Sequence, residues 1–200
     1  MADFAIAYKP VKDFEGQYSN DAADRGGETY CGIARNMFPK WPGWAILDRE
    51  KRIAGGNIAK MKKALLADGQ ISKLVDDWYR AEWWDRLGLA ALPQKLANEI
   101  FEQAINLGKG GAGKKVQLMC NAFNYKSGAA LFADLVVDGA IGPKTLAALQ
   151  KIISSGKSDA AALAHALNCL QGAHYIELAA KKPSQRVFTV GWMKRTYDEA

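Results

Sequence analysis

The sequence contains few residues of the kinds that form disulfides or bind metals. Its three cysteines, Cys31, Cys120 and Cys169, are an odd number without a Cys-x-x-Cys spacing. This argues against a disulfide framework and favours reduced, mostly buried thiols. Its two histidines, His165 and His174, are nine residues apart, on different faces of a helix, with no paired cysteine or histidine nearby. We therefore expect no metal site, and no local motif supports a Ser-His-Asp or Cys-His catalytic pair.

Long hydrophobic runs are also missing. No stretch approaches the roughly 18 consecutive apolar residues that a membrane-spanning helix needs. The first residues, MADFAIAYKPVKDFEG, lack a basic leader, a long apolar run and a small-residue cleavage site. We expect neither a signal peptide nor stable membrane insertion.

A long basic run is absent as well, although the chain has a net charge of +6 and a pI of about 9.2. Such a charge favours anionic partners such as nucleic acid, anionic membranes or bacterial cell wall. The lysines are scattered in pairs and no nucleic-acid-binding motif accompanies them, so we do not expect nucleic acid as the partner. With 200 residues, 49% of them hydrophobic, the chain can bury a sizeable core as one domain or two closely packed lobes.

Helical periodicity runs through most of the chain, whereas no long period-two alternation predicts a strand. Apolar residues near the start predict a helix leading into Glu15, in which Pro10 implies either a kink or the first residue of the helix. Four further stripes at helical spacing consist of Ile71, Leu74, Val75, Trp78 and Tyr79; Leu96, Ala97, Ile100, Phe101, Ala104 and Ile105; Val116, Met119, Cys120 and Phe123; and Leu163, Leu167, Leu170 and His174. We therefore predict a mainly α protein.

Glycine and proline mark the breaks between these helices. Residues 16–32 carry four glycines and predict a loop or a short hairpin. Residues 108–113, GKGGAG, predict a flexible turn after a helix that ends at Gly108. In residues 137–145, VDGAIGPKT, the Asp-Gly pair predicts a tight turn and Pro143 the first position of a helix. We favour this turn role for the segment over a binding role.

The segment 14–29, FEGQYSNDAADRGGET, has the side chains that glycoside hydrolysis requires. That reaction needs a carboxylic acid held protonated by apolar surroundings, and a second group that activates or positions water. Glu15 follows a phenylalanine at a helix-to-loop junction, Asp24 lies in a glycine-flanked loop, and Thr29 offers a hydroxyl that can hold a water. The alternative is structural, with Asp21 and Asp24 stabilising turns and Glu15 ending a helix.

The same segment resembles the signature of family 108 glycoside hydrolases, which runs roughly EGGY-x-ND-x-x-DPGG-x-T-x-x-GI. The residues that match it are Glu15, Gly16, Tyr18, Asn20, Asp21, Asp24, Gly26, Gly27, Thr29, Gly32 and Ile33. Gln17 replaces the second glycine and Arg25 replaces the usual proline. Both departures affect the stiffness of the loop more than its chemistry.

The resemblance continues in order along nearly the whole chain. Residues 79–108 are similar to the family's aromatic-rich helix and its FD-x-A-x-N-x-G helix. VQLMCNA and VDGAIGPKTLAAL resemble the peptidoglycan-binding type 3 region, and FTVGWMKRT (188–196) resembles its closing element. The resemblance implies a mainly α, lysozyme-like fold with a short loop or hairpin after the catalytic glutamate. It also implies N-acetylmuramidase activity on peptidoglycan, as in phage endolysins and in relatives labelled secretion activators.

The family role of catalytic acid falls on Glu15. The spacing Glu15-x8-Asp24-x4-Thr29 is similar to the E-x8-D-x5-T constellation of phage-type lysozymes, one residue shorter. We therefore expect Asp24, with a water held by Thr29, to assist attack at the anomeric carbon, with inverting or retaining stereochemistry left open. No metal or organic cofactor is expected.

Binding of the sugar rings requires aromatic and amide groups. We expect four substrate-binding residues, Tyr18, Tyr30, Gln103 and Asn106. We also expect residues 1–90 to form the catalytic lobe and residues 91–200 a helical, peptidoglycan-binding-like lobe packed on it as one compact unit. The expected partner is peptidoglycan, and the expected oligomeric state is a monomer.

Two other functions remain open at this stage. A lytic transglycosylase also relies on one glutamate but forms 1,6-anhydro products, and a non-catalytic protein for wall binding or secretion would use the fold as a scaffold. In each case we expect synthesis in the cytoplasm, with action on the cell wall or periplasm after release or assisted export.

Overall fold

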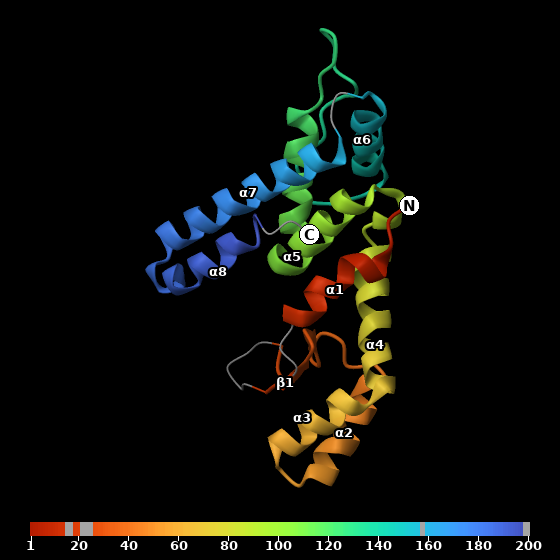
Figure 1. The fold of residues 1–200 in the computed structure, drawn as a ribbon, viewed down its shortest axis with the longest axis vertical. Coiled ribbons are helices and arrows are strands. Elements are labelled where there is room, and N and C mark those ends of the chain that lie inside the picture. The colour runs from red at the N-terminus through yellow and green to blue at the C-terminus, as the bar shows by residue number, and fades with distance from the viewer. Residues whose placement is uncertain (15–17, 21–25, 157–158, 198–200) are drawn as a thin grey trace. The chain divides into compact units, whose positions relative to one another are not determined.

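The computed structural model describes residues 1–14, 18–20, 26–156 and 159–197 (Figure 1). Within these ranges helices predominate, and the strands form one small antiparallel sheet in the order β1-β2-β3. Its strands are β1 (Tyr18–Ser19), β2 (Thr29–Tyr30) and β3 (Ile33–Ala34). The prediction of a mainly α, lysozyme-like fold with a short hairpin following Glu15 in the chain is confirmed.

The chain divides into two compact units. The hairpin unit comprises Val11–Glu82, and the long-helix unit comprises Met1–Pro10 together with Trp83–Ala200. Helix α1 (Phe4–Phe14) contributes residues to both. The functional division at residue 90 stays a prediction.

Three helices accompany the sheet in the hairpin unit, namely α2 (Gly43–Ala54), α3 (Ile58–Ala67) and α4 (Gly69–Tyr79). The side chain of Asn57 accepts a hydrogen bond from the amide of Lys60 at the start of α3, and Asp68 caps α4 in the same way. The predicted stripe of α4 is buried at Ile71, Val75 and Tyr79.

The long-helix unit is built around the pair α5 and α7, which pack against each other. Phe101 on α5 lies 5.7 Å from Trp84 and 5.9 Å from Phe4, measured between ring centroids. A π-helix, η1 (Arg80–Asp85), leads into this unit. The elements that follow are η2 (Leu89–Ala91), α5 (Gln94–Ala122), α6 (Pro143–Ser154), α7 (Ala160–Lys181), η3 (Pro183–Phe188) and α8 (Thr189–Lys194).

The predicted flexible turn at residues 108–113 is wrong. The predicted helix end at Gly108 is confirmed, because this residue leaves the helical conformation with φ 75° and ψ 156°, but a second helix begins at once and contains the rest of the glycine run, so that α5 consists of two helices joined at a kink. A Cβ added to Gly113 would lie 1.9 Å from the carbonyl oxygen of Gly139. The absence of a side chain at Gly113 therefore allows the turn at residues 137–142 to pass directly against α5.

One of the two alternatives for Pro10 is excluded, and one smaller prediction is corrected. Pro10 lies inside α1, so the helix does not begin there. On α7 the buried stripe continues from Leu167 through Gln171 to Tyr175, whereas the predicted His174 is exposed. Because α7 buries an amide in its stripe, an apolar pattern alone could not locate this face.

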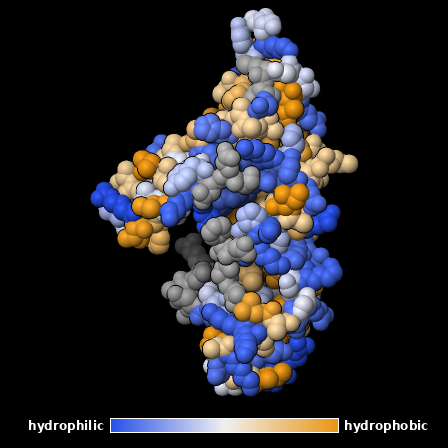
Figure 2. Space-filling model, in the orientation of Figure 1, coloured by the Kyte–Doolittle hydropathy of each residue, from blue (hydrophilic) through white to orange (hydrophobic). Residues whose placement is uncertain are grey.

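Along the ranges that the structure describes, none of the helices is both long and apolar enough to cross a bilayer. Figure 2 shows hydrophobic residues scattered among hydrophilic ones on the visible face.

Candidate active site

The hairpin unit places three of the predicted site residues on neighbouring strands. Tyr18 on β1 pairs with Tyr30 on β2, and Ser19 pairs with Thr29. Strands β2 and β3 are joined by Cys31 and Gly32, whose φ angles are 45° and 74°. Positive φ at both positions of a two-residue loop is the geometry that suits the twist of a hairpin.

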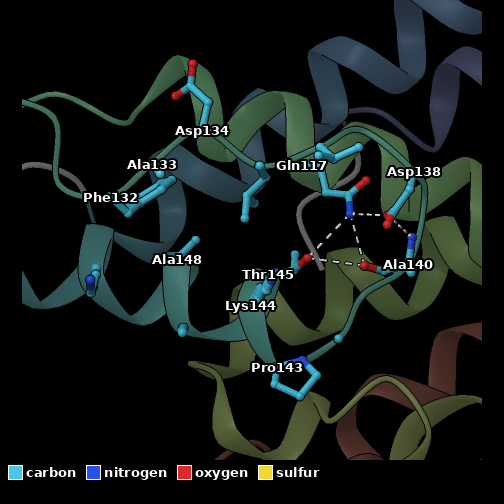
Figure 3. A pocket seen from close by; sticks show the side chains of 15 residues that line it. Gln117, Phe132, Ala133, Asp134, Asp138, Ala140, Pro143, Lys144, Thr145 and Ala148 are labelled. Carbon is cyan, nitrogen blue, oxygen red and sulfur yellow. Dashed lines mark hydrogen bonds between the residues drawn. The ribbon is translucent and has the colours of Figure 1, made fainter.

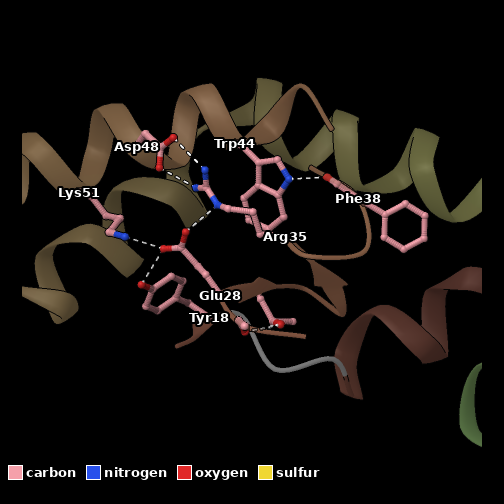
Figure 4. Close-up of polar contacts among 9 residues, drawn as sticks. Tyr18, Glu28, Arg35, Phe38, Trp44, Asp48 and Lys51 are labelled. Atoms are coloured by element: carbon pink, nitrogen blue, oxygen red, sulfur yellow. Dashed lines mark hydrogen bonds and ion pairs between the residues drawn. The ribbon is translucent and has the colours of Figure 1, made fainter. Parts of the chain in front are cut away.

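A polar cluster centred on Glu28 anchors this hairpin to α2 (Figure 4). The Glu28 carboxylate accepts hydrogen bonds from the Tyr18 hydroxyl at 2.9 Å and from Lys51 Nζ at 2.6 Å, and forms an ion pair with Arg35 Nε at 2.8 Å. Arg35 in turn donates to both carboxylate oxygens of Asp48, at 2.6 and 3.1 Å. The residue directly before Thr29 is thus held by three side chains, which come from β1, from the residue after β3 and from α2.

The charges of this cluster reinforce one another. The hydrogen bond from Arg35 lowers the pKa of Asp48, and the hydrogen bond to Glu28 raises the pKa of Lys51. The Arg35 guanidinium also lies 4.4 Å from the ring centroid of Trp44, where a cation is attracted to the aromatic face. The sequence did not distinguish Glu28 from its neighbouring carboxylates, and no local signal could have done so.

Thr29 is half-buried, and its hydroxyl donates to the carbonyl oxygen of Gly27 at 3.1 Å. This contact uses the only proton of the hydroxyl and leaves its lone pairs as acceptors. A water bound at Thr29 would therefore donate a proton to it and keep its own lone pair free. This geometry suits the water-holding role predicted for Thr29, which stays a prediction.

The two predicted tyrosines have different environments. Tyr18 is half-buried. The pKa of its hydroxyl is raised, mainly by burial and to a smaller extent by its hydrogen bond to Glu28. Tyr30 is only 4% exposed, and its ring lies against Trp41 at 6.3 Å between centroids. Their roles in substrate binding stay predictions. Glu15 and Asp24 lie outside the described residues.

Gln103 and Asn106 belong to a second polar cluster, between α5, α7 and the residues after α8. Gln103 is 1% exposed and donates to Glu99 at 2.7 Å. Asn106 is exposed, donates to Glu102 and accepts a hydrogen bond of 2.6 Å from Arg195. Both amides are therefore engaged within the chain, and their predicted contact with sugar is untested.

This second cluster also contains carboxyl groups that the sequence analysis did not single out. Burial raises the pKa of Glu99 to about 7, although Gln103 and Asn168 both donate hydrogen bonds to it. Burial likewise raises the pKa of Glu102, which accepts hydrogen bonds from Gln171 and Arg195. Among the residues that the structure describes, no group of three or more histidine, cysteine, aspartate or glutamate side chains could hold a metal ion.

The class of protein follows from comparison with known families. A family model described as "Glycosyl hydrolase 108" matches residues 8–108, and the chain belongs to this family of glycoside hydrolases. A second model, described as "Predicted Peptidoglycan domain", matches residues 117–197. Together the two matches support a hydrolase that acts on peptidoglycan.

Curated proteins and solved structures give two further findings. No curated protein matches the chain. Among solved structures the chain is similar to one described as "Structure of Brucella abortus SagA", with 22% identity, 98% of this chain and 94% of that chain covered, and a TM-score of 0.44.

Proposed function

We propose that this protein is an N-acetylmuramidase that hydrolyses the β-1,4 bond between N-acetylmuramic acid and N-acetylglucosamine, with Glu15 as general acid. The observation that carries the proposal is the family match over residues 8–108, which contains the whole FEGQYSNDAADRGGET segment. The last residue of α1 is Phe14, so Glu15 directly follows a helix and precedes the hairpin in the chain. Action on the wall after release or assisted export, as a monomer, is part of the proposal.

In this mechanism Glu15 protonates the glycosidic oxygen while water attacks the anomeric carbon. Thr29 accepts a hydrogen bond from that water, because the hydroxyl proton of Thr29 is already donated to Gly27. Asp24 accepts the second proton of the water or stabilises the positive charge that develops on the sugar. A separation of about 6.5–9.5 Å between the two carboxyl groups would lead to inversion, and about 5–5.5 Å to retention.

Rigidity of the hairpin supports this arrangement. Glu28 is held by Tyr18, Arg35 and Lys51, so the backbone leading into Thr29 is fixed before substrate binds. A fixed hydroxyl positions a water without reorganisation during the reaction, which is how preorganised polar groups accelerate chemistry.

The test compares Glu15→Gln with Glu177→Gln, a matched change at an exposed position of α7. We expect wild type and Glu177→Gln to clear a suspension of purified cell walls, and folded Glu15→Gln to lose that activity. Equal clearing by Glu15→Gln would overturn the assignment. If wild type binds walls and clears none, the protein is a binding module instead.

A further inference from the structure

The helices η3 and α8 near the end of the chain expose several large apolar side chains. Val187 and Phe188 of η3 are 79% and 52% exposed, and Val190 of α8 is 72% exposed. Tyr197, which follows α8, is 65% exposed. Single apolar residues scattered over a surface are normal, but four of them within residues 187–197 are a concentration that marks an interaction surface.

Other side chains of the same segment pack against α7 and α5. Trp192 stacks on Tyr175 of α7, with 5.2 Å between the ring centroids. Arg195 donates a hydrogen bond of 2.6 Å to Asn106 of α5 and forms an ion pair of 3.3 Å with Glu102. These contacts fix which side of α8 faces the rest of the unit and which side faces solvent.

The surface around the exposed apolar residues is positively charged. Residues 178–197 contain five basic and no acidic residues. Lys182, Arg186 and Lys194 are exposed, and none of them forms an ion pair with a residue that the structure describes. Lys194 follows Val190 by four residues on α8, so the two lie on the same side of the helix. Figure 2 shows hydrophobic and hydrophilic residues next to each other on the α7–α8 pair.

We infer that residues 182–197 bind the surface of a phospholipid bilayer that carries anionic headgroups. Lysine and arginine are attracted to such headgroups, while apolar side chains such as Val187 and Phe188 enter the boundary with the acyl chains. The ring of Tyr197 suits this boundary because one end is apolar and the other polar. The binding lies in the plane of the interface and is independent of the glycosidic chemistry proposed above.

Charge also distinguishes a membrane from a second copy of the chain. In a symmetric dimer the same surface of both copies would meet, so the cations of one copy would face those of the other. Like charges placed against each other across an interface are unfavourable. The exposed lysines and arginine therefore favour an anionic partner.

The experiment measures co-sedimentation of the full chain with vesicles of phosphatidylcholine, alone or mixed with an equal amount of phosphatidylglycerol. We expect binding to the mixed vesicles only. We also expect this binding to weaken as salt is added, because salt screens the attraction to the headgroups. Equal binding to both kinds of vesicle, or binding to neither, would overturn the inference.

A pair of charge variants tests the role of the lysines. Lys182→Gln/Lys194→Gln should bind mixed vesicles about thirtyfold more weakly, since each lysine near an anionic surface contributes about fivefold. The matched control is Lys144→Gln/Lys151→Gln on α6 (Figure 3 labels Lys144), which removes the same charge from exposed positions outside the segment. The control should bind as wild type does, and an equal loss there would assign the binding to net charge instead.

A pair of valine variants tests the apolar contribution. Val187→Ser should bind mixed vesicles about tenfold more weakly, because the valine side chain no longer becomes buried in lipid. Val136→Ser is the control, since Val136 is also 79% exposed and lies outside the segment. Wild-type affinity of Val187→Ser would contradict the inference, because the surface would then attract any polyanion without apolar contact with lipid.

Two further measurements separate this surface from self-association and from the proposed activity. Sedimentation velocity without lipid should show a monomer, and a dimer that Val187→Ser abolishes would assign the surface to a second copy and overturn the inference. Glu15→Gln should bind mixed vesicles as wild type does, because Glu15 lies outside residues 182–197. Failure of catalysis and failure of membrane binding are therefore distinguishable.

Discussion

Glu28 holds the hairpin in place through contacts that no sequence pattern indicated. It is adjacent to Thr29, its side chain is 11% exposed, and its partners come from β1, the residue after β3 and α2. A carboxylate with three converging donors cannot be recognised from its neighbours in the chain, because Lys51 is 23 residues away.

Replacing Glu28 should weaken the hairpin unit. Glu28→Gln keeps the shape of the side chain but removes the charge that faces Arg35 and Lys51. Since both cations are partly exposed, we expect the free energy of unfolding to fall by only about 1–2 kcal/mol. Urea denaturation measures this change, and Asp48→Asn is the control. Because Asp48 is 47% exposed and pairs with the terminal nitrogens of Arg35, we expect a smaller loss there, and a larger one would contradict the central role of Glu28.

Glu99 makes the stability of the protein depend on pH. Its pKa rises from 4.5 to about 7 on folding because burial disfavours the charged form. The folded state therefore binds the proton more tightly than the unfolded state, and stability is lost as pH rises from about 4.5 through about 7.

Glu99→Gln, which mimics the protonated form, should remove this contribution. We expect the difference in free energy of unfolding between the variant and wild type to grow in favour of the variant from pH 5 to pH 8, by on the order of 2 kcal/mol. Gln103 and Asn168 can still pair with a neutral amide at this position. Urea denaturation at both pH values gives the difference, and parallel pH profiles of the two proteins would show that Glu99 is not the group responsible.

Helix α5 shows where element-level prediction succeeds and fails. The stripe from Leu96 to Ala104 predicted a buried helix face, and these residues are buried. GKGGAG predicted a turn because glycine runs usually mark one. The decisive contact, between Gly113 and Gly139, joins residues far apart in the sequence and leaves no local signal.

Two glycine substitutions within this run should have opposite effects. Gly113→Ala places a Cβ against the carbonyl oxygen of Gly139 and should destabilise the protein by about 2–4 kcal/mol. Gly110→Ala meets nothing within 4 Å and should stabilise α5 by up to about 1 kcal/mol. Thermal unfolding of the two variants measures both shifts. A tolerated Gly113→Ala would show that the turn at 137–142 can move away from α5.

Across the whole molecule, the sequence predicted the class of protein better than it predicted how its residues are used. The motif at 15–33 and the later elements occur in a fixed order along the chain, so family 108 membership could be inferred and is confirmed. The hydrogen bonds that Gln117 and Asn121 on α5, and Asn124 beyond its end, make with the segment 131–140 were not predicted, although the i, i+4 spacing of the first two was a usable signal. These partners lie in an irregular segment, which periodicity does not describe.

The central claim is that Glu15 protonates the glycosidic oxygen while water attacks the sugar. The most direct test digests purified peptidoglycan in water enriched in heavy oxygen and analyses the products by mass spectrometry. We predict one heavy oxygen at each new reducing-end N-acetylmuramic acid with wild type, and no such product with folded Glu15→Gln. Anhydromuramic acid products without heavy oxygen, or labelled products from Glu15→Gln at the wild-type rate, would contradict the account.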